Sequence, residues 1–210
     1  MNKNVAGIVL AAGKSSRMGR PKALLPLGSE GQTFLTRIVG TFREVGVKEI
    51  LVVTAVGSEL TSALLNGNFP FRLILNESPE LGQLSSFQVG LQSLDLSKVS
   101  GILMTPVDVP LVSVETVQSL IEAHSESLAP VVRPVRKKAH GHPVIFDRAL
   151  FQEILFEPSD STVKAIVHRH RDRSVEVAVN ESGPFHDIDT PKDYEFLLRQ
   201  FKLKKSEMAG

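Results

Sequence analysis

The stretch from Val5 to Lys22, which reads VAGIVLAAGKSSRMGRPK, constrains the fold of this chain more than any other segment. Its apolar run Ile8-Val9-Leu10 has the β-branched character of a buried strand. The three small residues at 11–13 allow another molecule to approach the backbone closely. Four cations follow within nine positions, interleaved with serines and a glycine: Lys14, Arg17, Arg20 and Lys22. A buried strand that ends in a basic, hydroxyl-rich loop predicts an α/β protein that holds a polyphosphate.

The generic phosphate-binding motifs do not describe this loop. Gly13 and Gly19 are one residue too far apart for the pattern GxxxxGK[ST], and Arg20 stands where that pattern has lysine. The dinucleotide fingerprint GxGxxG is also missing here, which argues against a dinucleotide-dependent oxidoreductase. The structural alternative is a basic surface loop that merely follows a core strand.

Composition excludes several other classes of protein. The net charge of the 210 residues is +1, so no general affinity for nucleic acid is expected. The absence of cysteine excludes disulfides, thiolate metal sites and cysteine nucleophiles. No apolar run approaches the roughly 18 residues that a membrane span needs. We therefore expect a cytoplasmic protein with no membrane and no nucleic-acid partner.

Along the chain, β-rich apolar runs alternate with stretches of helical period, which is typical of a mostly parallel sheet covered on both faces. Strands are expected at 8–10, 50–54, 71–75, 101–105, 130–135, 143–146 and 174–179. Helices are expected at 33–45, 58–66, 83–94, 113–124, 147–156, 161–168 and 191–201. No linker divides the chain, so we predict one domain over residues 1–201 and a disordered tail at 202–210.

Asp108 is the first candidate for chemistry. It follows an expected strand and lies between Pro106 and Pro110, which stiffen the backbone on both sides. Ligands of open α/β sheets collect at the carboxyl ends of the strands, where the basic loop and the segment Gly82–Ser86 also lie. A carboxylate that faces a polyphosphate needs a cation between the two, and Mg²⁺ suits this position. Alternatively, Asp108 stabilises its own turn.

Two further groups of residues leave alternatives open. Asp187 and Asp189 point to one side if their segment is extended, yet the following Thr-Pro-Lys-Asp also makes a good helix start. Ser85 and Ser86 either cap a helix or contact a ligand. His140 and His142 share a strand-like face, but no third metal ligand is evident.

Residues 10–22, LAAGKSSRMGRPK, resemble the LAAGxSxRMGxxK signature of the molybdenum-cofactor nucleotidyltransferase (MobA-like) family, with every fixed residue present. The resemblance extends from Val5 to about Leu198. It implies a single-domain, Rossmann-like, three-layer α/β/α fold of the GT-A type with a mostly parallel mixed sheet. The implied reaction moves a nucleoside monophosphate from a nucleoside triphosphate to an acceptor phosphate, with Mg²⁺ as cofactor and pyrophosphate as the leaving group.

The resemblance also assigns roles to residues of this sequence. Asp108 matches the D-x-P metal motif, although Val107 stands where many relatives have glycine, and Asp189, then Asp187, match the D-x-D-T-P element that completes the metal site. Arg17, Lys22 and Asp108 are the expected catalytic residues. Gly141 and His142 match the GHP element that contacts the acceptor. The expected nucleotide-binding residues are Leu10, Ala11, Ala12, Gly13, Ser15, Arg17, Lys22, Gly82, Ser85 and Ser86.

Ala12 makes the signature more similar to the cytidylyl-transferring members of the family, because guanylyl-transferring members tend to carry glycine there. CTP as donor and molybdopterin as acceptor are therefore the first expectation, with a molybdoenzyme or its maturation factor as a protein partner. Transfer to a sugar, alditol or other small phosphate is one alternative. A nucleotide-binding module without turnover is another. The oligomeric state is not readable from the sequence.

Overall fold

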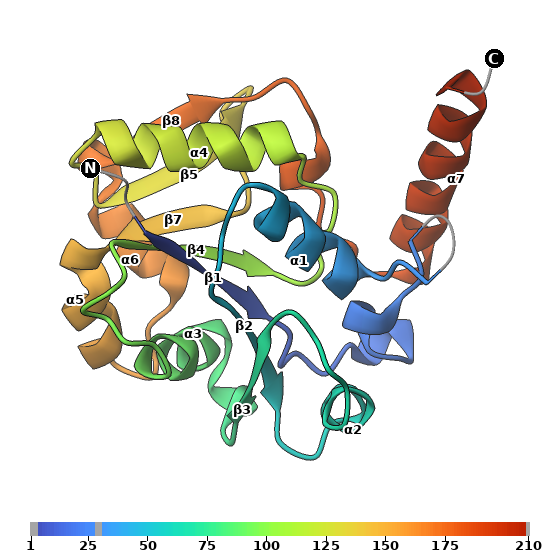
Figure 1. Ribbon diagram of the computed structural model, residues 1–210, viewed down its shortest axis with the longest axis horizontal. Coiled ribbons are helices and arrows are strands. Elements are labelled where there is room, and N and C mark those ends of the chain that lie inside the picture. Colours follow the sequence, from blue (N-terminus) through green and yellow to red (C-terminus); the bar gives the residue numbers. More distant parts are fainter. Residues whose placement is uncertain (1–3, 28–30, 209–210) are drawn as a thin grey trace.

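The computed structural model describes residues 4–27 and 31–208, and its centre is an eight-stranded mixed sheet (Figure 1). One half of the sheet is parallel and contains, in spatial order, β3 (Arg72–Asn76), β2 (Ile50–Ala55), β1 (Val5–Leu10) and β4 (Gly101–Pro106). The other half contains β7 (Val144–Asp147), β5 (Val131–Arg136) and β6 (Ala139–His140), joined antiparallel, with β8 (Val175–Ala178) parallel to β5. The expected mixed, mostly parallel sheet is confirmed.

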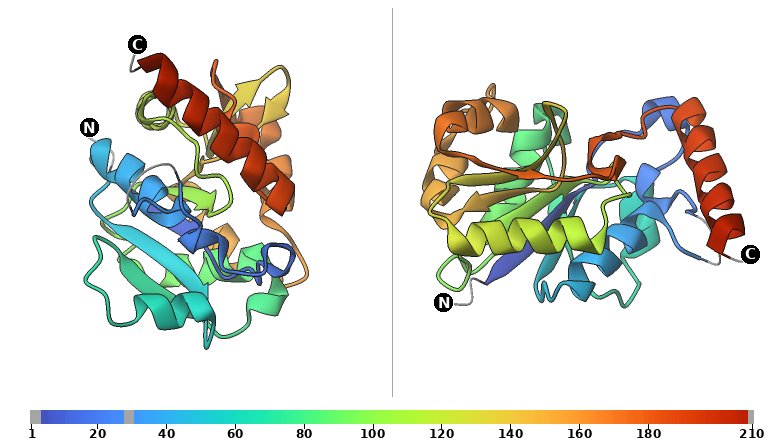
Figure 2. Two further views of the ribbon diagram at one scale, coloured as in Figure 1. Left: turned by 90° about the vertical axis from the view of Figure 1, so that its right-hand side faces the viewer. Right: turned by 90° about the horizontal axis from the view of Figure 1, so that it is seen from above.

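Helices cover both faces of this sheet, which gives three layers (Figure 2). All six residues of β1 are buried. Val9 packs with the side of α1 (Phe34–Glu44) and α4 (Val114–Glu126). Ile8 packs on the opposite face, with α3 (Gln83–Gln92), α5 (Phe151–Phe156) and α6 (Val163–Arg169). Burial on both faces explains why the strand reads as a continuous apolar run rather than an alternating one.

The remaining helices lie at the edge that carries the basic loop. α2 (Glu59–Leu64) follows β2, and α7 (Pro191–Met208) projects from the body of the molecule (Figure 1). α7 continues beyond residue 201, where the sequence predicted its end. Residues 202–208, expected to be a disordered tail, are therefore helical, because the helical pattern that starts at Pro191 meets no proline or glycine before Gly210. Residues 209–210 lie outside the described residues, and no described helix has the length and apolarity to cross a membrane.

Candidate active site

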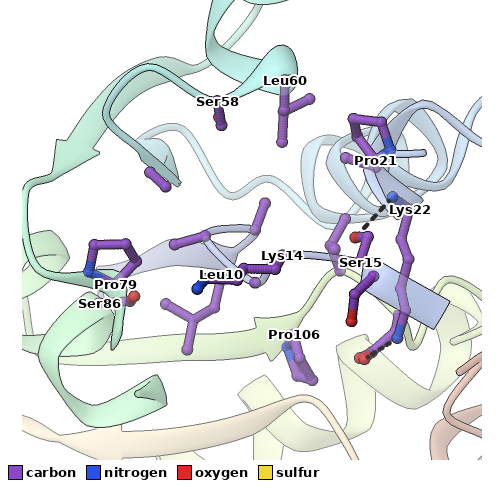
Figure 3. Close-up of a pocket in the computed structure, with 18 of the residues that line it drawn as sticks. Leu10, Lys14, Ser15, Pro21, Lys22, Ser58, Leu60, Pro79, Ser86 and Pro106 are labelled. Atoms are coloured by element: carbon purple, nitrogen blue, oxygen red, sulfur yellow. Dashed lines mark hydrogen bonds and ion pairs between the residues drawn. The ribbon is translucent and has the colours of Figure 1, made fainter. Parts of the chain in front are cut away.

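A pocket of about 840 Å³ opens at the carboxyl edge of the sheet, where β1, β2 and β4 end (Figure 3). Most of the loop between β1 and Ala23 forms one wall, and short segments after β2, β3 and β4 form the others. The residues of the predicted site that line the pocket are Leu10, Ala11, Ala12, Gly13, Ser15, Arg17, Lys22, Gly82, Ser86, Asp108 and Asp189. Those that do not line it are Ser85, Gly141, His142 and Asp187.

The basic loop is held in shape by its own backbone. The amide of Ala11 donates to the carbonyl of Val53 in β2 at 2.8 Å, which fixes the loop where it leaves the sheet. Ser15 adopts a left-handed conformation (φ 48°), and its hydroxyl accepts a hydrogen bond from the amide of Lys22 at 3.2 Å. Gly19 has φ 68°, a conformation that glycine adopts without steric cost. The loop therefore closes on itself and brings Lys22 back to the end of β1.

Lys22 lies at the centre of an ion cluster. Its ammonium donates to Asp108 Oδ2 at 3.0 Å and to Asp189 Oδ1 at 2.5 Å, and the Lys22 side chain is only 11% exposed. The guanidinium of Arg17 donates to Asp189 Oδ2 at 3.0 Å from a largely exposed position. Three segments that are distant in the sequence thus meet through one ammonium group.

The charges of this cluster stabilise one another. Burial lowers the pKa of the Lys22 ammonium, but the hydrogen bond to Asp189 and the charge of Asp108 together raise it by more. The hydrogen bond from Lys22 in turn lowers the pKa of Asp189. Desolvation raises the pKa of Asp187, and the neighbouring charges of Asp108 and Asp189 add to this rise. Asp187 is therefore electrostatically close to the cluster, although it does not line the pocket.

The path of the chain around Asp108 is fixed by two backbone hydrogen bonds. The amide of Val107 donates to the carbonyl of Leu10 at 3.0 Å and so extends the pairing of β1 with β4. The amide of Ile188 donates to the carbonyl of Asp108 at 2.9 Å, which places the Asp189 segment beside the Asp108 turn. Val107 is buried, so the turn before Asp108 accommodates a valine side chain.

The helix start after Asp189 is formed by other residues. The hydroxyl of Thr190 accepts from the amide of Asp193 at 3.2 Å, and the amide of Thr190 donates to the Asp193 carboxylate at 2.8 Å. This reciprocal pair caps α7. The Asp189 carboxylate accepts from Lys22 and Arg17 instead. The acidic site and the helix start, which the sequence left as alternatives for this segment, are therefore both present and use different residues.

The two serines of α3 have separate surroundings. Ser86 lines the pocket, whereas the Ser85 hydroxyl donates to the carbonyls of Ser78 and Gly82 at 3.0 and 3.3 Å. Gly82 has φ 89° and ψ −163°, which glycine alone adopts readily. Ser85 therefore supports the loop that carries Gly82, rather than forming the pocket wall.

The GHP segment is held by the backbone just before Asp187 and Asp189. The amide of His142 donates to the carbonyl of Pro184 at 2.8 Å. A Cβ on Gly141 would lie 2.4 Å from that same oxygen, so only glycine fits. Burial lowers the pKa of His142 to about 4, against a small opposing effect of the Asp108 charge. His140 bonds to Glu176 at the surface at 2.7 Å, and nothing in this geometry joins it with His142 at a metal.

One part of the pocket wall was not predicted from the sequence: the end of β2, the turn that follows it and the start of α2. Ala55, Val56, Ser58, Glu59 and Leu60 all line the pocket. The signal was available, because β2 is parallel to β1 and its carboxyl end must reach the same edge of the sheet.

The carboxylates of the cluster can be compared with the ligand set that a divalent metal needs. Among the side chains described, those of residues 4–27 and 31–199, no three acidic or histidine groups form a complete metal cage. However, carboxylate oxygens of Asp108 and Asp189 already converge on a single cation, the Lys22 ammonium. Mg²⁺ is usually bound by one or two carboxylates, with substrate phosphates and water completing its shell. This pair therefore fits Mg²⁺ together with a polyphosphate.

Comparison with named proteins shows two kinds of relative. A probable molybdenum cofactor guanylyltransferase of Rhodopirellula baltica is 39% identical over 126 residues, or 60% of this chain. That match spans only 58% of the relative's own length. Nicotine blue oxidoreductase of Paenarthrobacter nicotinovorans is 28% identical over 201 residues, which cover 92% of this chain and 96% of that protein.

Solved structures are similar to this chain over nearly its whole length. The crystal structure of Rv0371c from Mycobacterium tuberculosis matches with a TM-score of 0.80 and 28% identity, covering 95% of this chain and 99% of that one. The same protein has been solved in complex with manganese, with a TM-score of 0.77 and 26% identity. Residues 7–175, which are most of the 210 residues of this chain, match the model of the MobA-like NTP transferase domain. The chain therefore belongs to the MobA-like NTP transferase family.

Proposed function

We propose that this chain is a Mg²⁺-dependent nucleotidyltransferase that moves a nucleoside monophosphate from a nucleoside triphosphate to an acceptor phosphate. The observation that carries the proposal is the Lys22 ammonium held between Asp108 and Asp189 at one end of a pocket of about 840 Å³. A lysine and two carboxylates that meet at the carboxyl edge of the parallel strands form a site for a polyphosphate and its metal ion.

Each residue of the cluster has a role in this reaction. Arg17 and Lys22 neutralise the triphosphate, and Asp108 and Asp189 hold Mg²⁺, with Asp187 adding negative charge behind them. The metal supplies a Lewis acid for the charge that develops on the phosphate oxygens. The acceptor phosphate attacks the α-phosphorus, the bond to the β-phosphate oxygen breaks, and pyrophosphate leaves with that electron pair. An acceptor phosphate is already a nucleophile, so positioning and charge stabilisation are sufficient and no general base is needed.

The donor is proposed to be CTP and the acceptor a molybdopterin-type phosphate. The methyl group of Ala12 on the pocket wall supports a pyrimidine, because it occupies space that glycine would leave for a larger base. The name of the Rhodopirellula relative supports GTP instead. Gly141 and His142 are proposed to contact the acceptor; they do not line the pocket, but the charge of Asp108 acts on His142. A molybdoenzyme or its maturation factor would receive the product.

Pyrophosphate release tests this function. Each of the four ribonucleoside triphosphates is offered with Mg²⁺, with and without molybdopterin. Release with CTP alone among the four, and only in the presence of molybdopterin, supports the full proposal. Release with GTP transfers the assignment to a guanylyltransferase. Release that depends on a different phosphate compound keeps the reaction and replaces the acceptor.

An oxidoreductase is the second candidate, since nicotine blue oxidoreductase matches 92% of this chain. The absence of GxGxxG after β1 argues against a dinucleotide in the usual position. Titration with NADH, NADPH and oxidised flavins, followed by fluorescence, distinguishes the two functions. Saturable dinucleotide binding without triphosphate binding would replace the nucleotidyltransferase proposal.

A further inference from the structure

Asn76 is a buried polar residue at the end of β3 that the proposed reaction does not use. The residue is 2% exposed, and its side chain reaches the first turn of α3. There its amide nitrogen lies 3.0 Å from Ser85 Oγ and 3.0 Å from Ser86 Oγ. A buried amide that bonds two adjacent hydroxyl groups determines which way those groups can donate.

The orientation of the Asn76 amide is fixed by the backbone. The amide of Ser78 lies 2.9 Å from Asn76 Oδ1, and a backbone N–H can only donate, so that atom must be the carbonyl oxygen. The NH₂ group therefore faces the two serines, and both of its protons are donated to their hydroxyl oxygens. The Ser85 proton is donated to backbone carbonyls in its turn.

Ser86 differs from Ser85 because it faces the pocket. Its oxygen accepts from Asn76, and within residues 4–27 and 31–199 its hydroxyl has no other hydrogen-bond partner. Ser86 is also buried, with 3% of the residue exposed, and a hydroxyl proton without an acceptor is costly there. The proton of Ser86 is consequently available for a ligand in the pocket.

The position of Ser86 indicates which part of the ligand it meets. Ser86 and Pro79 lie at the opposite end of the pocket from Ser15 and Lys22 (Figure 3). A triphosphate whose phosphates lie near Lys22 places its nucleoside at the Ser86 end. We propose that Asn76 is a positioning residue that fixes Ser86 as a hydrogen-bond donor to an acceptor atom of the nucleoside, an inference that rests on the proposed function.

A serine that must donate its proton can donate it only to certain atoms of the nucleoside. Ser86 donates its proton to a carbonyl oxygen, an unprotonated ring nitrogen or a ribose oxygen of the nucleoside. Asn76→Asp reverses the arrangement: the carboxylate still accepts from the Ser78 amide, but it now requires a proton from Ser86. The serine then presents an acceptor to the pocket, and the matching bond is lost.

The test measures binding of each of the four ribonucleoside triphosphates, with Mg²⁺, by titration calorimetry. For the triphosphate that the unaltered chain binds best, we expect Asn76→Asp to weaken binding about tenfold, the value of one hydrogen bond. Ser86→Ala removes only the hydroxyl and should weaken binding by a similar factor. The double variant should bind no more weakly than Ser86→Ala, because Asn76 acts through Ser86.

A matched control removes a hydroxyl at the carboxyl-terminal cap of α3. Ser93 donates to the carbonyl of Val89 at the far end of that helix, so Ser93→Ala should leave binding unchanged. Unchanged binding by Ser86→Ala, or additive losses in the double variant, would overturn the role of Asn76 and leave the nucleotidyltransferase intact. If the unaltered chain binds none of the four triphosphates, the proposed function falls, and this inference falls with it.

Discussion

Asp108 is the residue on which the proposed chemistry depends most directly. It lies after β4, and its carboxylate is one of the two that bond to Lys22. We predict that Asp108→Asn lowers kcat/KM for nucleotidyl transfer by about a thousandfold, because the neutral amide is a poor ligand for Mg²⁺. Steady-state pyrophosphate release measures this loss. Asp95→Asn, which removes an exposed carboxylate paired with Lys98, is the matched control and should retain full activity. Near-normal turnover of the Asp108 variant would remove the metal role.

His142 predicts a pH dependence of stability at the same scale. Burial lowers its pKa from 6.5 to about 4, so between these values the unfolded chain binds a proton that the folded chain does not. Stability therefore rises with pH across this window, by at most about 1.4 kcal/mol per pH unit from this residue. In His142→Asn this contribution disappears, and the curve between pH 4 and 6.5 should be flatter. Urea unfolding at several pH values gives both curves, and identical slopes would refute the assignment.

At the scale of elements, local signals placed most of the fold correctly. The hydroxyls of Ser58 and Ser113 cap helices at the expected starts, because a cap depends on residues only three positions apart. Contacts across the chain were not predictable in this way. Glu181, for example, accepts a hydrogen bond from the amide of Ser113 at 3.0 Å across 68 positions. No pattern near either residue indicates that contact.

In the candidate site, too, some residues were predictable from local sequence and others depend on packing. The basic loop and Asp108 were predictable because each directly follows a strand whose carboxyl end is known from the parallel order. Which of Ser85 and Ser86 faces the pocket was not, because neighbouring residues of a helix differ by about 100° in direction. That choice depends on how α3 packs on the sheet through Leu84 and Phe87.

Gly183 links the segment that carries Asp189 to the turn after Asp108. A Cβ at this position would lie 1.9 Å from the carbonyl oxygen of Leu111. We predict that Gly183→Ala destabilises the protein by about 1–3 kcal/mol, because backbone on both sides must move. Gly40→Ala is the same change in α1, where no atom lies within 4 Å, and it should stabilise by about 0.5–1 kcal/mol. Denaturant unfolding measures both, and equal signs would contradict the packing argument.

At the scale of the whole molecule, the ion cluster joins distant parts of the chain. Lys22 is 86 positions from Asp108 and 167 from Asp189, so its two bonds tie the first loop to the centre of the sheet and to the segment before α7. The pocket is consequently completed only when the chain is folded from end to end. Any change at Lys22 should affect stability as well as the site.

Lys22→Ala separates these two effects, because the ammonium and a metal ion compete for the same carboxylates. Without metal, Asp108 loses the Lys22 ammonium and Asp189 keeps only the exposed Arg17 guanidinium, and we predict a loss of about 1–3 kcal/mol in the free energy of unfolding. Millimolar Mg²⁺ or Mn²⁺ should restore part of this loss and bind more tightly than to the unaltered chain, although transfer activity stays low. Thermal unfolding with increasing metal concentration measures the response, and Lys98→Ala, which breaks an exposed pair, is the control. The same metal response in all three proteins would mean that Asp108 and Asp189 are not where the metal binds.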